Sequence, residues 1–301
     1  MSEIRVMPIG GQNFQDLREK GFVYVDKTQY VFQLVSTNKL YFLSRPRRFG
    51  KSLLLSTLDA YFSGKQELFK GLYLERAELE FAAREKREAW QQYPVLYLDL
   101  NAERYAQPHD LENALNTHLV RWEQRYGKEA SEATFSSRFM GVIRRAYEQT
   151  GRQVVVLIDE YDKPLLDTIN KPELNDTYRD ILRAFFSVIK SSDRYLRFAF
   201  LTGVTRFSKV SVFSGLNNLR DISLLSDFAG ICGITEQELA TNLVRREMLL
   251  WLSLKSATMA ISLRERGKMF TTLLAYSMFL HRESSQIIGT QQVHPPFSLN
   301  T

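Results

Sequence analysis

The stretch from Leu40 to Leu55, LYFLSRPRRFGKSLLL, constrains the fold of this chain more than any other part of the sequence. Its first four residues are apolar and predict a buried strand. From Lys51 onward, apolar residues recur at helical spacing and predict a helix. A basic turn separates the two elements. A strand that passes directly into a helix is the building unit of α/β folds, in which helices cover a mainly parallel sheet.

The basic turn has the composition of a site for anionic ligands. Four cations lie within seven residues, namely Arg45, Arg47, Arg48 and Lys51. The first N–H groups of a helix have no intrahelical partner and lie at its positive dipole end, so an anion can bind there. Lys51 would reach the β- and γ-phosphates of a nucleoside triphosphate, and the Ser52 hydroxyl would bind Mg²⁺. The usual phosphate-loop pattern has Gly at the position of Arg45, so the agreement is partial.

Further apolar runs and helical patterns alternate along the chain. Val154–Ile158 consists of consecutive apolar residues, as is typical of a strand buried on both faces in the centre of a parallel sheet. The other expected strands are Phe22–Val25, Val95–Leu100 and Leu196–Leu201. Helical spacing predicts helices over Gln29–Val35, Leu111–Tyr126, Phe139–Gln149 and Asp176–Lys190. The alternation predicts an α/β fold of the P-loop NTPase-like type, with a mainly parallel sheet flanked by helices.

Two acidic residues, Asp159 and Glu160, directly follow the expected central strand. Ligands of open α/β sheets bind at the carboxyl ends of the strands, so we expect both carboxylates beside the basic turn. Asp159 is a candidate ligand of Mg²⁺, and Glu160 is a candidate general base for an attacking water. At the end of the next strand, Thr202 could orient that water and Arg206 could neutralise transition-state charge.

Each candidate also has a structural interpretation. Asp159-Glu160 could form a solvated turn after a strand. A strand-end hydroxyl and a surface cation explain Thr202 and Arg206 as well as catalytic roles do. The Arg47-Arg48 pair could belong to a solvated face, but its position next to Lys51 favours contact with an anion.

Composition excludes several classes of protein. A chain of 301 residues with 44% hydrophobic residues suits one large or two ordinary globular domains. No run is long enough for a membrane span and the N-terminus lacks the core of a signal peptide, so we expect a soluble cytoplasmic protein without a membrane partner. The single cysteine, Cys232, excludes an internal disulfide and a Cys-based metal site. Of the net charge of +6, residues 244–301 contribute +4, because they contain seven Lys/Arg and three acidic residues.

Several stretches of the sequence resemble the bacterial AAA-ATPase-like family. The most specific are Tyr24–Thr28 (YVDKT), Leu43–Leu53 (LSRPRRFGKSL), Leu157–Leu165 (LIDEYDKPL) and Leu201–Ser208 (LTGVTRFS). Together with Met7–Phe14 and Gly230–Glu238, they extend the resemblance over residues 4–243. The loop of this family itself carries Arg-Pro-Arg-Arg-Phe, so Arg45 in place of Gly agrees with the family pattern.

The resemblance implies a P-loop NTPase core that uses ATP and Mg²⁺. We assign nucleotide binding to Arg47, Arg48, Phe49, Gly50, Lys51, Ser52 and Leu53, metal binding to Ser52 and Asp159, and catalysis to Lys51, Glu160, Thr202 and Arg206. Full-length relatives usually continue into a C-terminal domain that resembles PD-(D/E)XK nucleases, which implies work on nucleic acid. We expect this chain to be too short to contain that domain.

Residues 244–301 do not resemble the family. The family would continue with Tyr-Asn/Asp-Gly-Tyr-x-Phe, then Val-Tyr-Asn-Pro-Phe-Ser, then Asn-Tyr-Trp and Thr-Gly-Thr-Pro-Thr-Phe-Leu. The tail can be back-translated into permitted codons and read in a shifted frame, which takes the third base of each codon with the first two bases of the next. In that frame, residues 257–263, 269–275 and 286–298 can encode all of these motifs in order. We therefore expect an out-of-frame, poorly structured tail, with the slip between Leu243 and Ser256. The alternative is a divergent tail with packing helices over Leu249–Leu254 and Phe270–Leu280.

Three functions are compatible with this sequence. The first is Mg²⁺-dependent ATP hydrolysis by a water that Glu160 orients, in a domain that the altered C-terminus could disable. The second is a nucleotide-gated binding module that recognises a partner with little turnover. The third is contact of the arginine-rich loop with nucleic acid, whose affinity would fall steeply with salt. The sequence leaves open whether the protein is an oligomer in which Arg206 acts at a neighbouring subunit's site.

Overall fold

The computed structural model describes residues 8, 10–205, 212–213, 216, 218–238, 264–265 and 268–271. The chain divides into two units, residues 1–232 and 233–301. In the second unit, β8 (Lys268–Thr271) pairs antiparallel with β6 (Ile234–Thr235) and with β7 (Arg264–Glu265). Most of the predicted out-of-frame tail lies outside the described residues, so its origin stays a prediction.

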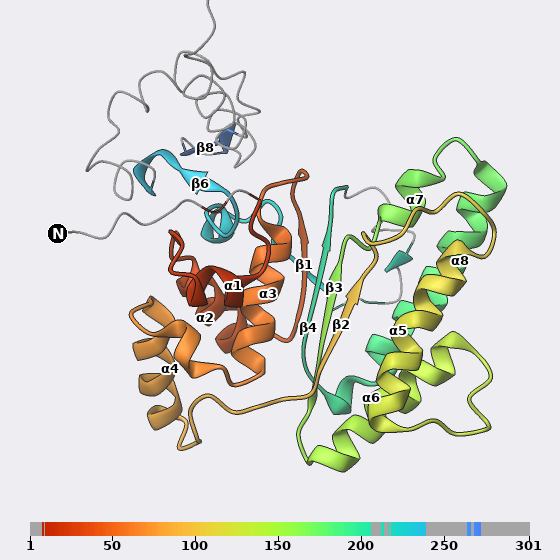
Figure 1. The fold of residues 1–301 in the computed structure, drawn as a ribbon, viewed down its shortest axis with the longest axis horizontal. Coiled ribbons are helices and arrows are strands. Elements are labelled where there is room, and N and C mark those ends of the chain that lie inside the picture. Colours follow the sequence, from red (N-terminus) through yellow and green to blue (C-terminus); the bar gives the residue numbers. More distant parts are fainter. Residues whose placement is uncertain are drawn as a thin grey trace, which may run out of the picture. The chain divides into compact units, whose positions relative to one another are not determined.

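A five-stranded sheet forms the centre of the first unit (Figure 1). Its strands are β1 (Leu40–Ser44), β2 (Val95–Asp99), β3 (Val154–Asp159), β4 (Leu196–Gly203) and β5 (Arg220–Asp221). They lie in the order β2-β3-β4-β1-β5, and each neighbouring pair is parallel. The predicted α/β fold with a parallel sheet, consistent with a P-loop NTPase-like fold, is confirmed.

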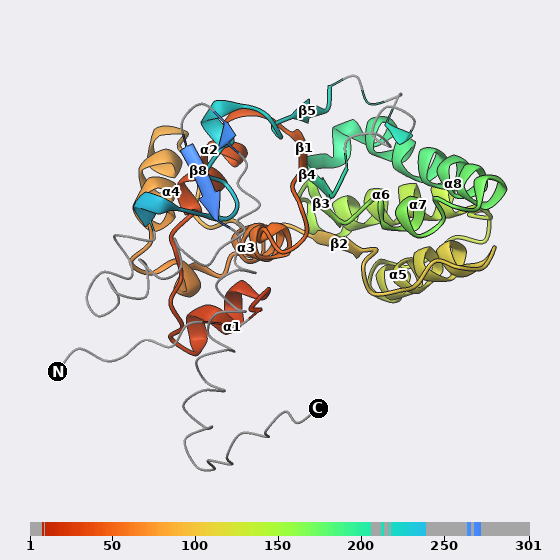
Figure 2. The same ribbon diagram turned by 90° about the horizontal axis from the view of Figure 1, so that it is seen from above.

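Helices cover both faces of this sheet, and both ribbon views show this arrangement (Figures 1 and 2). One side carries α1 (Phe14–Glu19), α2 (Thr28–Thr37), α3 (Lys51–Phe62) and α4 (Tyr73–Arg84). The other carries α5 (Asp110–Tyr126), α6 (Phe135–Thr150), α7 (Lys163–Asp167) and α8 (Pro172–Ser191). Within the described residues, no helix is long and apolar enough to cross a membrane.

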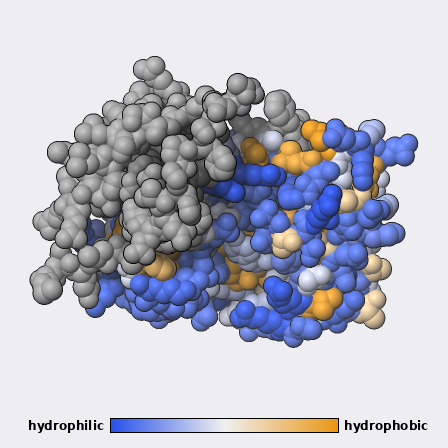
Figure 3. Space-filling view, turned by 45° about the horizontal axis from the view of Figure 1, so that its top comes forward, coloured by the Kyte–Doolittle hydropathy of each residue, from blue (hydrophilic) through white to orange (hydrophobic). Residues whose placement is uncertain are grey.

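Burial of the central strands explains their composition. Every residue of β3 is buried, and the residues from Val154 to Ile158 have no exposed surface. Helices cover both faces of a parallel sheet, so its strands carry continuous apolar runs in place of alternating ones. Elsewhere, the described surface in Figure 3 is mainly hydrophilic with small hydrophobic groups, and Ile169 is the most exposed large hydrophobic residue at 69%.

The helices predicted within residues 10–205 and two of the three other predicted strands, Val95–Leu100 and Leu196–Leu201, are present, with ends that differ by a few residues. The predicted strand Phe22–Val25 is wrong, because these residues pair with no strand in the described part of the chain. Their aromatic content serves packing instead, since the ring of Tyr24 lies 5.1 Å from that of Phe14. The next residues form a turn in which Asp26 Oδ1 accepts hydrogen bonds from Thr28 N and Oγ1 at 2.8 and 2.6 Å.

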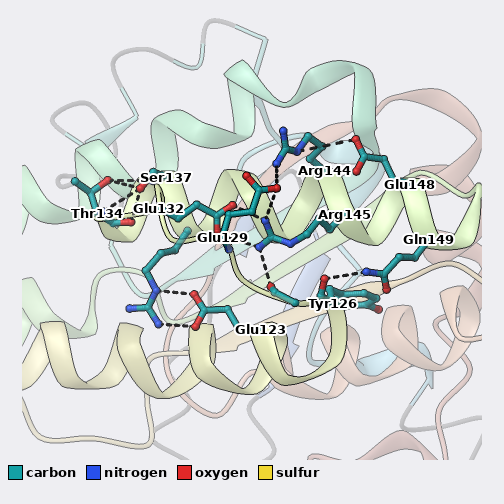
Figure 4. A network of polar contacts seen from close by, with 12 residues as sticks. Glu123, Tyr126, Glu129, Glu132, Thr134, Ser137, Arg144, Arg145, Glu148 and Gln149 are labelled. Atoms are coloured by element: carbon teal, nitrogen blue, oxygen red, sulfur yellow. Dashed lines mark hydrogen bonds and ion pairs between the residues drawn. The ribbon is translucent and has the colours of Figure 1, made fainter.

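Ion pairs join α5, α6 and the loop between them (Figure 4). Glu123 on α5 pairs with Arg138 on α6 through two hydrogen bonds of 2.6 and 2.9 Å. In the loop, Glu132 pairs with Arg145 of α6, whose Nη2 lies 3.0 Å from Oε2 of the acid. Burial alone would raise the pKa of Glu132, but the hydrogen bonds from Arg145 hold it below its usual range. Gly141 makes this approach feasible, because a Cβ there would lie 1.7 Å from Glu132 Oε1.

We expect Glu132→Gln to lower the free energy of unfolding by about 2–3 kcal/mol, because the neutral amide leaves the Arg145 guanidinium without its buried partner charge. Urea unfolding measures the difference. Glu148→Gln is the matched control: this side chain is 56% exposed and lies 4.0 Å from Arg144, so its change should stay below about 0.5 kcal/mol. Equal effects of the two substitutions would contradict the assignment of Glu132.

Candidate functional site

The strand order brings the predicted site residues to one edge of the sheet. Since β4 lies between β1 and β3, its end is adjacent both to the loop after β1 and to the acidic turn after β3. Thr202 is in register with Leu43, and the preceding Leu201 is in register with Ile158. Thr202 therefore lies between the basic loop and the two carboxylates.

The basic loop enters α3 through unusual backbone geometry. Arg48 and Gly50 have positive φ angles of 64° and 90°. Gly50 has the freedom for this conformation because it lacks a Cβ. It is also the N-cap of α3, and no side chain caps that end. The first N–H groups of this helix are therefore available to an anionic ligand.

Lys51 is the first residue of α3, and its ammonium group is buried at the centre of the loop. The side chain is 3% exposed. Its Nζ donates to the carbonyl oxygens of Arg45 at 3.0 Å and Pro46 at 3.3 Å. It also forms an ion pair with Glu160, with 3.2 Å between Nζ and Oε1. A buried ammonium group is costly without such partners, and these three oxygen atoms compensate for its loss of water.

Glu160 has the strained geometry that is common at functional sites. Its φ angle is 53°, which is uncommon for a residue other than glycine. Its backbone N–H donates to Thr202 Oγ1 at 3.2 Å, which helps to hold this conformation. One carboxylate oxygen faces Lys51, and the other, Oε2, is buried without a hydrogen-bond partner in the described part of the chain. This atom can accept a proton or a hydrogen bond from a ligand.

Asp159 and Thr202 contact each other directly. The Thr202 hydroxyl donates to Asp159 Oδ1 at 2.5 Å, and both residues are almost completely buried. Because the same hydroxyl accepts from Glu160 N, Thr202 fixes both acidic residues in one arrangement. The structure thus brings Lys51, Glu160, Asp159 and Thr202 into one connected network.

Other ionisable groups surround this network. Asp99 at the end of β2 is in register with Asp159, and burial together with that carboxylate raises its pKa. Burial and the same two carboxylates also raise the pKa of Tyr97. The Cys232 thiol is buried, which raises its pKa to about 11 and keeps it protonated at neutral pH.

The four cations of the loop have different environments. Arg45 is buried, and its guanidinium donates to the carbonyl oxygens of Ser44, Ser223 and Phe228. No carboxylate lies within ion-pair distance of it in the described residues. The arginine in place of the usual glycine thus anchors the loop to the segment after β5. Arg47 and Arg48 are exposed and remain candidates for contact with an anion.

The remaining predicted residues are placed as follows. Phe49 is buried at 2% exposure, so its side chain is not available to a ligand. Ser52 and Leu53 are partly exposed on the first turn of α3. Arg206 lies outside the described residues.

Two contributors to the site were missed by the sequence analysis. Ser223 accepts from Ser44 N at 2.8 Å and so extends the contacts of the loop with the segment after β5. Asp162 is completely buried beside the end of β4. Neither has a signal in the periodicity of the sequence. An acidic residue shortly after a central strand could at most have suggested that Asp162 lies near the site.

We expect Arg45→Met to lower the free energy of unfolding by about 2 kcal/mol, because the buried carbonyl groups lose a charged donor. Arg47→Met is the matched control in the same loop, and its exposed side chain predicts a change within about 0.5 kcal/mol. Chemical denaturation of both variants tests the difference. A value for Arg45→Met as small as the control's would show that the buried contacts contribute little.

Most of this chain is similar in sequence to known proteins. Residues 8–213 match the AAA-ATPase-like family model, which is described as a predicted AAA-ATPase. An uncharacterized protein from Azotobacter chroococcum mcd 1, named for its position in the vnfD 5' region, is 44% identical over 234 residues. That match covers 77% of this chain and 43% of the relative's length. No solved structure matches the chain. The extent of the family match shows that this chain belongs to the AAA-ATPase-like family of predicted AAA-ATPases.

Proposed function

We propose that this protein binds ATP with Mg²⁺ and hydrolyses it. The observation that carries the proposal is the buried contact between Lys51, at the uncapped start of α3, and Glu160, at the end of a central strand. Phosphoryl transfer requires mainly a positioned cation, a positioned carboxylate and backbone donors for the phosphate oxygens. These groups meet here at one sheet edge.

Binding of a triphosphate would exchange the partners of Lys51. Its ammonium group is held by two carbonyl oxygens and one carboxylate oxygen, and phosphate oxygens are suitable substitutes for all three. The free N–H groups at the start of α3 suit the same ligand. Ser52 and Asp159 would hold Mg²⁺, which neutralises charge on the phosphate oxygens when bound.

Glu160 is the proposed general base. The partnerless Oε2 would accept the proton of a water that attacks the γ-phosphate. Release of Oε1 by Lys51 on nucleotide binding would free the carboxylate from its ion pair. Thr202 would keep the carboxylates in place, and we propose Arg206 as a cation that stabilises charge in the transition state.

A second candidate function is a nucleotide-gated binding module with negligible turnover. The Lys51–Glu160 ion pair favours it, because nucleotide binding would break a buried contact between α3 and the turn after β3. Such an exchange can change the protein's shape without hydrolysis. Nucleic-acid binding by the loop is less supported, since Arg45 donates only to carbonyl groups of the protein.

We expect Lys51→Ala to weaken ATP binding by about 100-fold, because the variant loses a charged donor to the phosphates. Isothermal titration calorimetry with ATP and Mg²⁺ measures the change. Lys65→Ala is the matched control near the other end of α3, where its Nζ donates to Gln15. Unchanged affinity in Lys51→Ala would refute the assignment of the phosphate site.

We expect Glu160→Gln to lower the rate of ATP hydrolysis by about 100-fold or more and to leave ATP bound, because the amide cannot accept the proton of the attacking water. Phosphate release under saturating ATP measures the rate. Glu173→Gln, at an exposed position on α8, is the control for removal of a negative charge. Equal, near-zero rates for the wild type and Glu160→Gln, with ATP bound by both, would instead support the binding module.

A further inference from the structure

Asp162 is a buried carboxylate with a binding role that the proposed mechanism does not use. It lies two residues after Glu160, directly before α7, and has no exposed surface. No Lys, Arg or His in the described residues forms an ion pair with it. An ionised carboxylate in such a place is costly unless hydrogen bonds satisfy its oxygens.

Within the described residues, the hydrogen-bond donors to the Asp162 carboxylate all belong to the segment that follows Thr202. Oδ2 accepts from Val204 N at 3.0 Å, Thr205 N at 2.7 Å and Thr205 Oγ1 at 2.8 Å. Oδ1 lies 3.1 Å from Val204 N. Hydrogen bonds from neutral donors to a carboxylate are stronger than those between neutral groups, and burial strengthens them further. Asp162 therefore binds the backbone N–H groups of Val204 and Thr205, directly after the end of β4.

Tyr161 holds the same segment from the adjacent position. Its N–H donates to Thr202 O at 2.9 Å, and its hydroxyl donates to Thr205 O at 3.2 Å. Its ring packs against Gly203 so closely that a Cβ at residue 203 would lie 2.4 Å from it. The turn after β3 and the end of β4 thus form one rigid unit.

This unit also contacts the phosphate loop, because Arg45 N donates to Gly203 O at 3.2 Å. A shift of residues 203–205 would therefore change two distances at once. It would move the Thr202 hydroxyl relative to Asp159 and Glu160, and it would move the carboxylates relative to the loop. Displacements of about 1 Å at such a site can cost as much as 100-fold in rate.

We infer that Asp162 is a positioning residue for the proposed hydrolysis, which binds the end of β4 to the acidic turn and so fixes the Thr202 hydroxyl between Asp159 and Glu160. The inference rests on the proposed function. Asp162 acts through Thr202 and does not touch the nucleotide, because its oxygens are occupied by donors of Val204 and Thr205.

The test is Asp162→Asn in the full chain, with Asp110→Asn as the matched control. Asp110 also accepts from two backbone N–H groups, those of Ala106 and Gln107, both at 2.7 Å, but in the turn before α5. We expect kcat of Asp162→Asn to fall roughly 10- to 100-fold, while the Kd for ADP changes less than about threefold, because the phosphate loop keeps its own contacts. Asp110→Asn should keep kcat within about twofold of the wild type.

Two further measurements separate positioning from general destabilisation. Hydrogen exchange at the amides of Val204 and Thr205 should become faster in Asp162→Asn and stay unchanged in Asp110→Asn. Thr205→Val is a milder second variant, because it removes the hydroxyl donor to Asp162 and leaves the Asp162 carboxylate and the backbone donors in place. We expect a smaller loss of kcat in this variant, about two- to fivefold, again without a change in the Kd for ADP.

Several outcomes would overturn the inference. They are an unchanged kcat in both Asp162→Asn and Thr205→Val, an equal loss of kcat in Asp110→Asn, and a loss of ADP affinity that matches the loss of rate. A wild-type protein that binds ATP and does not hydrolyse it would overturn the proposed function, and the positioning role with it. Turnover of the wild type therefore distinguishes the two failures.

Discussion

The backbone of β4 is hydrogen-bonded to β1 on one side and to β3 on the other, and the candidate site depends on this placement. The basic loop follows β1 and the carboxylates follow β3, and these two strands do not pair with each other. The end of β4 joins them. Thr202 bonds to both acidic residues, and Gly203 O accepts from the first loop residue, Arg45. The relative position of lysine and carboxylate is therefore set by a third strand, through the side chain of Thr202 and the main chain of Gly203.

The buried charges of the site are stabilised in two ways. Lys51 and Glu160 partly neutralise each other, whereas Arg45 and Asp162 are satisfied by carbonyl and N–H groups of the main chain. Main-chain partners hold fixed positions and are not displaced by a ligand. The Lys51–Glu160 pair, in contrast, consists of two side chains, which the proposed nucleotide binding would separate. The site thus combines charges held mainly by the main chain with one ion pair between two side chains.

Local sequence signals were sufficient for most of the fold and for the central residues of the site. The apolar run Val154–Ile158 identified the central strand, and the Asp-Glu pair at its end identified the acidic turn. The same signals failed where contacts with distant parts of the chain determine the local structure. Phe22–Val25 has strand-like composition, yet no strand lies beside it, and the side chain of Arg45 is indistinguishable from its exposed neighbours until the segment after β5 is placed. The strand order, and with it the role of Asp162, follows from long-range pairing that periodicity does not encode.

The contacts of Arg45 have a consequence for where this domain can be said to end. The family match stops at residue 213, but the guanidinium of the first loop residue is bound by carbonyl groups of Ser223 and Phe228. Ser223 also receives a hydrogen bond from Ser44, at the end of the strand that leads into the loop. The shortest fragment of the chain that keeps these hydrogen-bond partners of the loop must therefore extend to Phe228, fifteen residues beyond the end of the family match.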